Sequence, residues 1–154
     1  MTFIGFSQKQ KWIFALMFWT ICTPTLAATV PQNGSTGRLE RLLTAIRSVE
    51  TGNNDKAIGD KGKALGSFQI HEIYWKDAVQ YDKVIGGKYT DVTNYAYAKK
   101  IVLAYFDRYG KGKSCYELCQ IHNGGPNGIK VTATKAYADR VHARYIKLFG
   151  FDDW

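Results

Sequence analysis

A glutamate at the end of an apolar helical stripe has the setting of an acid catalyst. Glu50 follows Ile46 by four residues and Leu43 by seven, so the three side chains share one face of a helix. Burial at the edge of that face disfavours the charged carboxylate and raises its pKa. A carboxyl group that keeps its proton near neutral pH can donate it to a leaving group. The alternative is a glutamate that turns to solvent in the last helical turn.

A polar, glycine-rich loop follows this helix and carries two further carboxylates. The stretch "NNDKAIGDKGKALG" holds Asp55 and Asp60 between several glycines, which indicates hairpins or an irregular loop that returns to the helix end. Glycoside hydrolysis needs two carboxyl groups across a cleft. One protonates the bridging oxygen, and the other stabilises or attacks the developing cation or activates water. A solvated loop is the alternative, and the acid spacing does not match a regular calcium-binding loop.

His122 and Asn123 begin a glycine turn, "HNGGPNG", and are candidates to orient a ligand. A histidine at a helix end also commonly bonds the last carbonyl groups, which is the alternative for His122. The pair His71-Glu72 is not a zinc motif, because Trp75 stands where a second histidine is required. We therefore expect chemistry that uses neither a metal nor a cofactor.

The spacing of apolar residues predicts a mainly helical domain around these groups. In chain order we expect a helix from Gly37 to a C-cap at Gly52, a short helix in "HEIYWKDAVQY" and a buried central helix from Tyr95 to Tyr109. A fourth helix carries both cysteines and starts at a Ser114–Glu117 capping box. The last helix runs from Ala136 to Phe149 and is capped by Thr134. Ile73, Tyr74 and Trp75 of the short helix can pack in the core or stack against a ligand.

The first 27 residues have the pattern of an export signal. Lys9 and Lys11 precede the apolar run "WIFALMFWTIC", and Thr25 and Ala27 fit the small-residue positions before a cleavage site. The run is shorter than the ~20 residues that a spanning helix needs, so no stable membrane anchor is expected. We expect residues 1–27 to be a signal peptide, residues 28–37 a linker and residues 38–154 one domain. The protein is then exported, and is periplasmic or secreted.

The chain is basic, with a formal net charge of +8. The charge falls to +6 when Lys9 and Lys11 leave with the signal. A basic exported protein suits an anionic partner such as cell wall, lipid headgroups or polysaccharide. Export disfavours nucleic acid, the usual partner of a basic chain. Solubility alone is the alternative reason for the charge.

Only Cys115 and Cys119 remain after removal of the signal. An oxidising compartment allows a disulfide between them, and we expect one. Their spacing of four on one helix puts the pair near the long end of disulfide geometry. A zinc site is not expected, because two cysteines lack further ligands at a suitable spacing.

Three motifs together resemble the lysozyme superfamily. They are "SVETG" at Glu50, "GDKGKALGSFQI" at Asp60 and "IHNGGPNG" at His122. The pattern is most similar to invertebrate-type lysozymes, with a looser similarity to goose-type lysozymes and lytic transglycosylases. It spans about Leu39 to Tyr145.

The resemblance implies an α+β fold, mainly α, with a small β-hairpin and loop region beside an active-site cleft, and makes residues 38–154 a catalytic domain. It implies that Glu50 is the general acid and Asp60 the second carboxylate. The substrate-binding residues that it implies are Ser67 and Gln69 on the cleft floor, and His122, Asn123 and Gly124 on the far wall.

The expected activity is cleavage of the β-1,4 bond between N-acetylmuramic acid and N-acetylglucosamine in peptidoglycan. A lytic transglycosylase that forms 1,6-anhydro products is one alternative, and a catalytically silent wall-binding or inhibitor-like domain is another. Invertebrate-type lysozymes are rich in cysteine, so the two cysteines here fit a bacterial protein better. Transglycosylases usually have tyrosine at the position of His122, which favours the invertebrate-type branch. Isopeptidase activity, associated with some invertebrate-type relatives, would call on Ser67 or a lysine together with His122, but the spacing does not indicate a nucleophile and base.

Overall fold

The computed structural model describes residues 34–154 of the 154-residue chain. The predicted signal peptide and most of the predicted linker therefore lie outside the described residues. Within residues 34–154, the search for a helix of sufficient length and apolar character to span a membrane finds none.

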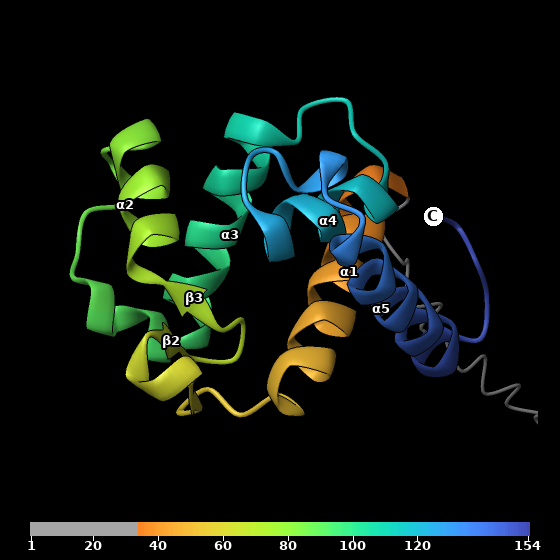
Figure 1. Cartoon of the computed structure of the whole chain (residues 1–154), viewed down its shortest axis with the longest axis horizontal. Coiled ribbons are helices and arrows are strands. Elements are labelled where there is room, and N and C mark those ends of the chain that lie inside the picture. Colours follow the sequence, from red (N-terminus) through yellow and green to blue (C-terminus); the bar gives the residue numbers. More distant parts are fainter. Residues whose placement is uncertain (1–33) are drawn as a thin grey trace, which may run out of the picture. The chain divides into compact units, whose positions relative to one another are not determined.

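The described chain is mainly helical and carries one small sheet (Figure 1). In order, its elements are α1 (Gly34–Thr51), β1 (Ile58–Gly59), η1 (Asp60–Gly62), β2 (Ala64–Leu65), β3 (Ile70–His71), α2 (Glu72–Tyr81), η2 (Tyr89–Thr93), α3 (Tyr95–Tyr109), α4 (Cys115–Gly124), η3 (Gly128–Lys130) and α5 (Ala133–Phe149), where η marks a 3₁₀ helix. The α+β, mainly α class predicted from the sequence is confirmed.

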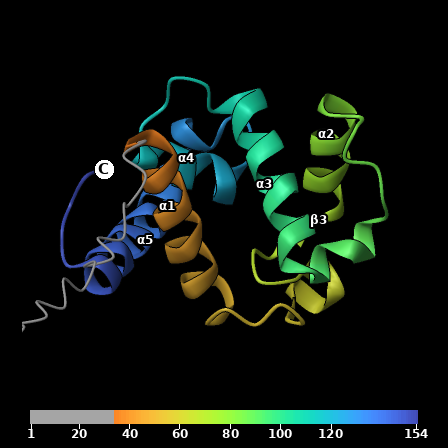
Figure 2. The same ribbon diagram turned by 180° about the vertical axis from the view of Figure 1, so that it is seen from behind.

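Two helix pairs flank α4. Helix α1 lies beside α5, and α2 lies beside α3, in both ribbon views (Figures 1 and 2). The apolar stripe of α1 is fully buried at Leu42, Leu43 and Ile46, and the centre of α3 is fully buried at Ile101 and Val102. This packing confirms the predicted stripes, and it fixes the end of α1 that carries Glu50.

The small sheet positions the loop that carries Asp60. Its three antiparallel strands pair in the order β1-β2-β3, with Ile58 opposite Leu65 and Ala64 opposite His71. Asp60 begins the turn between β1 and β2. The expectation of hairpins in the glycine-rich loop is confirmed.

Two helix starts differ from the prediction. Helix α1 begins at Gly34, before Gly37, and α5 begins at Ala133, so that Thr134 lies inside the helix. The Thr134 hydroxyl donates to the Gly128 carbonyl oxygen at 2.8 Å and does not cap the helix. The predicted Ser114–Glu117 capping box of α4 is confirmed.

The predicted disulfide is wrong. Cys115 and Cys119 are both free and buried on α4. Residues four apart on a helix lie one turn apart along the axis, and both thiols pack into the core.

Candidate active site

Glu50 ends the buried face of α1 and is held by a tyrosine from α5. Its side chain is 18 % exposed, and its Oε1 accepts a hydrogen bond of 2.6 Å from the Tyr137 hydroxyl. Burial raises the pKa of Glu50, while the Tyr137 hydrogen bond and the charge of Arg140 oppose the rise. The direction agrees with the prediction from the helical stripe. Because Tyr137 occupies Oε1, Oε2 is the oxygen that is left to carry the acid proton.

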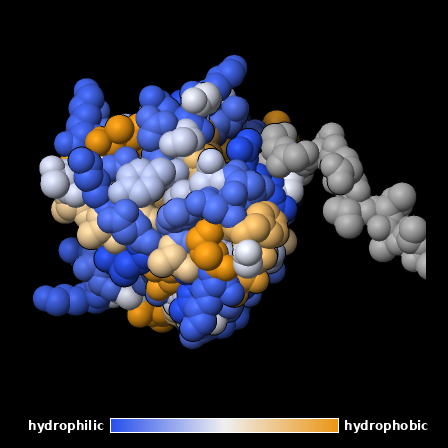
Figure 3. Space-filling model, turned by 90° about the vertical axis from the view of Figure 1, so that its right-hand side faces the viewer, coloured by the Kyte–Doolittle hydropathy of each residue, from blue (hydrophilic) through white to orange (hydrophobic). Residues whose placement is uncertain are grey.

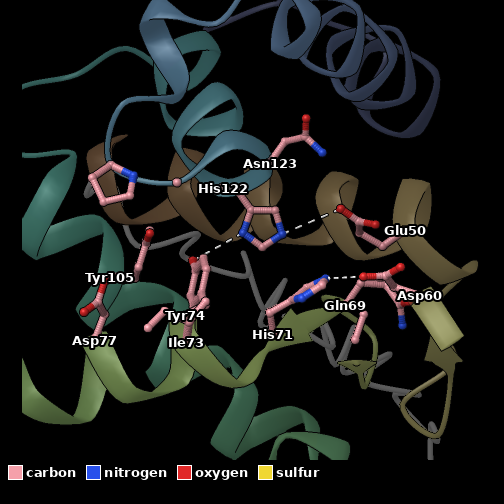
Figure 4. A pocket seen from close by; sticks show the side chains of 13 residues that line it. Glu50, Asp60, Gln69, His71, Ile73, Tyr74, Asp77, Tyr105, His122 and Asn123 are labelled. Atoms are coloured by element: carbon pink, nitrogen blue, oxygen red, sulfur yellow. Dashed lines mark hydrogen bonds and ion pairs between the residues drawn. The ribbon is translucent and has the colours of Figure 1, made fainter. Parts of the chain in front are cut away.

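His122 lies between Glu50 and the aromatic side of the cleft (Figure 4). Its side chain is 4 % exposed, its Nε2 lies 3.2 Å from the Phe68 carbonyl oxygen, and its Nδ1 lies 3.3 Å from the Tyr74 hydroxyl. A carbonyl oxygen only accepts, so Nε2 carries the hydrogen and Tyr74 donates to Nδ1. This is a neutral imidazole, and burial lowers the pKa of His122 to about 4. Its Nε2 lies 3.7 Å from Glu50 Oε1, and the neutral imidazole brings no positive charge to that carboxyl group at neutral pH.

A cleft of about 510 Å³ joins Glu50, Asp60, Gln69, His122 and Asn123. Figure 4 shows Glu50 and Asp60 at one end of it, reaching the cleft from α1 and from the β1–β2 turn. Asp60 is 58 % exposed, and its Oδ2 lies 3.5 Å from His71 Nε2. The structure thus brings the two predicted carboxylates to one cleft, one sheltered and one solvated.

Two residues of the cleft have a backbone conformation that residues other than glycine rarely adopt. Asp60 has φ 44° and Gln69 has φ 48°, both in the left-handed region. Such residues concentrate at functional sites, where the surrounding structure holds them. Two glycines make room for this segment. A Cβ on Gly59 would lie 1.9 Å from Gln69 Oε1, and a Cβ on Gly66 would lie 2.1 Å from the Val92 carbonyl oxygen.

Other predicted positions lie elsewhere. Ser67 is fully buried and does not line the cleft, because the chain from Gly66 to Gln69 turns instead of extending as a strand. Gly124 is exposed but lies against α5, where a Cβ would meet Thr134 Cγ2 at 2.6 Å. Asp55 pairs with Arg47 at 2.9 Å, which ties the loop to α1. These three placements favour structural roles.

Ser67 and His122 do not form a nucleophile and base pair. The Ser67 hydroxyl is buried without a hydrogen-bond partner among the described residues, and both ring nitrogens of His122 face other groups. The geometry therefore gives no support to serine-based isopeptidase chemistry. Within residues 34–154, no cluster of three His, Cys, Asp or Glu side chains is placed to hold a metal ion.

Sequence reasoning missed part of the cleft. The cleft lining adds His71, Asp77, Tyr105 and Pro126, and Tyr137 donates a hydrogen bond to Glu50. Ile73 and Tyr74 were considered for stacking, and both reach the cleft, whereas Trp75 donates to the Tyr97 hydroxyl instead. The helical period of α5 could have placed Tyr137 on the buried face with Val141 and Tyr145. Nothing else in the sequence points to its contact with Glu50.

Solved structures with this fold are lysozymes. The lysozyme of Tapes japonica matches with a TM-score of 0.58 and 25 % identity, over 67 % of this chain and 87 % of that chain. A crystal structure of Aeromonas hydrophila PliI in complex with Meretrix lusoria lysozyme matches with a TM-score of 0.59 and 31 % identity, over 68 % of this chain and 88 % of that chain. The lysozyme-like fold predicted from the three motifs is confirmed.

Residues 40–144 match the model of the destabilase family, and the chain belongs to this family. It is 35 % identical to lysozyme 1 of Crassostrea virginica over 120 residues, which are 71 % of this chain and 62 % of the oyster protein. It is 37 % identical to a lysozyme of Magallana gigas over 84 residues, which are 51 % of this chain and 58 % of that protein. The chain thus spans about three fifths of the length of these relatives. The predicted resemblance to invertebrate-type lysozymes is confirmed.

Proposed function

We propose that the protein is a muramidase, which hydrolyses the β-1,4 bond between N-acetylmuramic acid and N-acetylglucosamine in peptidoglycan. The observation that carries the proposal is the environment of Glu50. A buried carboxyl group with a raised pKa opens onto a cleft that also contains a solvated carboxylate. Membership of the destabilase family and the likeness to oyster lysozymes support the substrate class.

Glu50 is the general acid in this proposal. Tyr137 donates to Oε1 and so favours the proton on Oε2, from which it passes to the oxygen of the leaving sugar. His122 is neutral beside Glu50, so it adds no positive charge that would favour early loss of the proton. Its role is to hold the wall of the cleft through Tyr74 and Phe68.

Asp60 is the second carboxylate. It stabilises the oxocarbenium-like transition state, attacks the anomeric carbon or prepares the attacking water. Its side chain is exposed in the cleft, where a sugar ring would cover it on binding. Gln69 and Asn123 line the same cleft, and their amide groups are suited to bind sugar hydroxyls.

Lytic transglycosylation is the second candidate function. In that reaction the 6-hydroxyl of the muramyl sugar closes a 1,6-anhydro ring, so no second carboxylate is needed. The loose placement of Asp60 favours this function. Its side chain is 58 % exposed, and among the described residues its one ion-pair contact is with His71. A silent wall-binding domain is disfavoured, because it would not need a buried Glu50 with a raised pKa.

We further propose that the protein acts outside the cytoplasm, in the periplasm or after secretion. Support comes from the basic and apolar pattern of residues 1–27. The active protein should then begin at Ala28. An active form that retains residues 1–27 by intact mass would contradict export by this route.

Clearing of a peptidoglycan suspension tests the acid directly. Glu50→Gln keeps the shape of the side chain and accepts the Tyr137 hydrogen bond, but has no acidic proton to give. Clearing should slow by about 10²–10⁴-fold with unchanged circular dichroism. Near wild-type clearing by the folded variant would refute the assignment.

A further inference from the structure

A positively charged groove lies beside Glu50, on the outer side of the contact between α1 and α5. Its volume is about 420 Å³, and its lining includes Ser48 and Val49 from α1 and Arg140, Arg144 and Lys147 from α5. The three basic residues recur at spacings of four and three, so they form one stripe along α5. Figure 3 shows the side of the molecule that carries α5, where hydrophilic residues surround small, separate apolar patches.

The groove lies close to Glu50 and Tyr137. Ser48 and Val49 directly precede Glu50, and the Arg140 guanidinium lies 5.6 Å from the centre of the Tyr137 ring. Arg140 is also close enough for its charge to lower the pKa of Glu50. Glu50 contacts Tyr137 and Arg41 contacts Tyr145, so α1 and α5 are antiparallel. The stripe therefore leads away from Glu50 along α5.

The charges of the groove are not neutralised within the described part of the chain. None of the ion pairs among residues 37–154 involves Arg140, Arg144 or Lys147. Within α5 the one acid is Asp139, and it accepts a hydrogen bond from Tyr116 at 2.8 Å. Three cations along one groove, with no carboxylate paired to them, suit a ligand with several anionic groups.

We propose that this groove binds the carboxylates of the peptide stems that peptidoglycan carries on its muramyl residues. The proposal rests on the muramidase function proposed above. A glycan strand in the cleft, with its scissile bond at Glu50, carries the stem of an adjacent muramyl residue close to α5. Arg140, whose charge acts on Glu50, is the residue of the stripe from which we expect stem binding to begin. Arg140 and Lys147 are seven residues apart, which is about 10 Å along a helix. Three extended peptide residues span about the same length, so the stripe matches the reach of a stem with spaced carboxylates.

Binding to two forms of one glycan tests the proposal. The protein carries Glu50→Gln to prevent cleavage, and the ligands are glycan strands with intact stems and the same strands after an amidase has removed the stems. The groove variant is Arg144→Glu with Lys147→Glu. The control is Lys100→Glu with Lys111→Glu, which makes the same change in charge on exposed residues outside the groove. If the groove variant does not fold, as judged by circular dichroism, Arg144→Gln with Lys147→Gln replaces it.

The groove variant should bind strands with stems about three- to thirtyfold more weakly than the control, with little difference on stripped strands. The preference for stems should also fall as salt is raised. Equal affinities of groove and control variants for strands with stems would overturn the proposal. So would an equal loss on stripped strands, since the groove would then act on polyanions without regard to stems.

The test separates the groove from the catalytic proposal. Binding is read in a protein that cannot cleave, whereas the muramidase proposal is read from products of the protein with Glu50. If the Glu50→Gln protein prefers strands with stems but the protein with Glu50 releases no products, the muramidase proposal is wrong and the groove is still a stem-binding site.

Discussion

The Tyr137 hydroxyl donates a hydrogen bond of 2.6 Å to Glu50 Oε1, across 87 positions of sequence. This contact joins α5 to the C-terminal end of α1, and it engages one of the two oxygens of the carboxyl group. It also stabilises the ionised form of Glu50, and so it limits the rise in the pKa of Glu50 that burial causes. The two largest influences on the pKa of Glu50, burial and this hydrogen bond, therefore oppose each other.

Removal of this hydroxyl should change both the rate and its pH dependence. Tyr137→Phe deletes the donor and keeps the ring, so we expect a fall in kcat of about fivefold, the worth of about 1 kcal/mol of hydrogen bonding. Without the donor the pKa of Glu50 rises further, and the loss of activity on the alkaline side should move to higher pH. A rate profile of kcat against pH measures both. An alkaline limb that moves to lower pH would show that the hydroxyl does not act on the acid.

Asp60 should matter to the rate without being required for the fold. Asp60→Asn removes the second carboxylate at a half-exposed site, so we expect a much slower enzyme with an unchanged unfolding temperature. Lys83→Gln, another substitution of an exposed charged residue, outside the cleft, serves as the control. Full activity of Asp60→Asn would reduce Asp60 to a loop residue and favour transglycosylation.

His122 should make the folded state sensitive to mild acid. Burial lowers its pKa to about 4 from an ordinary 6.5, so its stabilising contribution is complete above pH 6.5 and is lost as the pH falls toward 4. Over that window the free energy of unfolding should drop on the order of 3 kcal/mol.

Urea unfolding at pH 7 and pH 4.5 measures the drop. A His122→Gln variant, less stable overall, should lose much less between the two values. Carboxylates with a lowered pKa, such as Glu117 and Asp153, act in a lower pH range and affect both proteins alike. Parallel losses in the two proteins would contradict a buried, neutral His122.

The two cysteines should titrate as thiols. Both are free and buried, and burial raises the pKa of each, so the reactive thiolate is scarce in the folded protein. For a chain that begins at Ala28, a thiol reagent should find almost none in the native state and two after denaturation without reductant. The absence of reactive thiols after denaturation would show that the two cysteines form a disulfide.

The elements with strong periodicity could be predicted from the sequence, and so could the burial of Glu50. The stripe of Leu42, Leu43 and Ile46 predicted both the helix and the sheltered setting of Glu50, because one helical period determines both. Helix starts were less certain, since the same threonine can cap a helix or, as Thr134 does, bond a neighbouring turn from within it.

Contacts between distant segments could not be read in this way. Tyr137 reaches Glu50 only because α5 packs antiparallel to α1, and nothing local to either segment specifies that pairing. The resemblance places Ser67 on the cleft floor, yet the left-handed backbone at Gly66 and Gln69 turns its side chain into the core. Side-chain direction in such a turn depends on dihedral angles that a motif does not state.

Mass spectrometry of the released muropeptides distinguishes the proposed hydrolysis of peptidoglycan by Glu50 with Asp60 from the alternatives. Purified protein that begins at Ala28 is incubated with peptidoglycan beside a matched Glu50→Gln sample, and the ends of the glycan products are identified. We predict reducing N-acetylmuramic acid ends, formed by the Glu50 protein and nearly absent from the variant. Products that are mainly 1,6-anhydro, or equal release by both proteins, would contradict it.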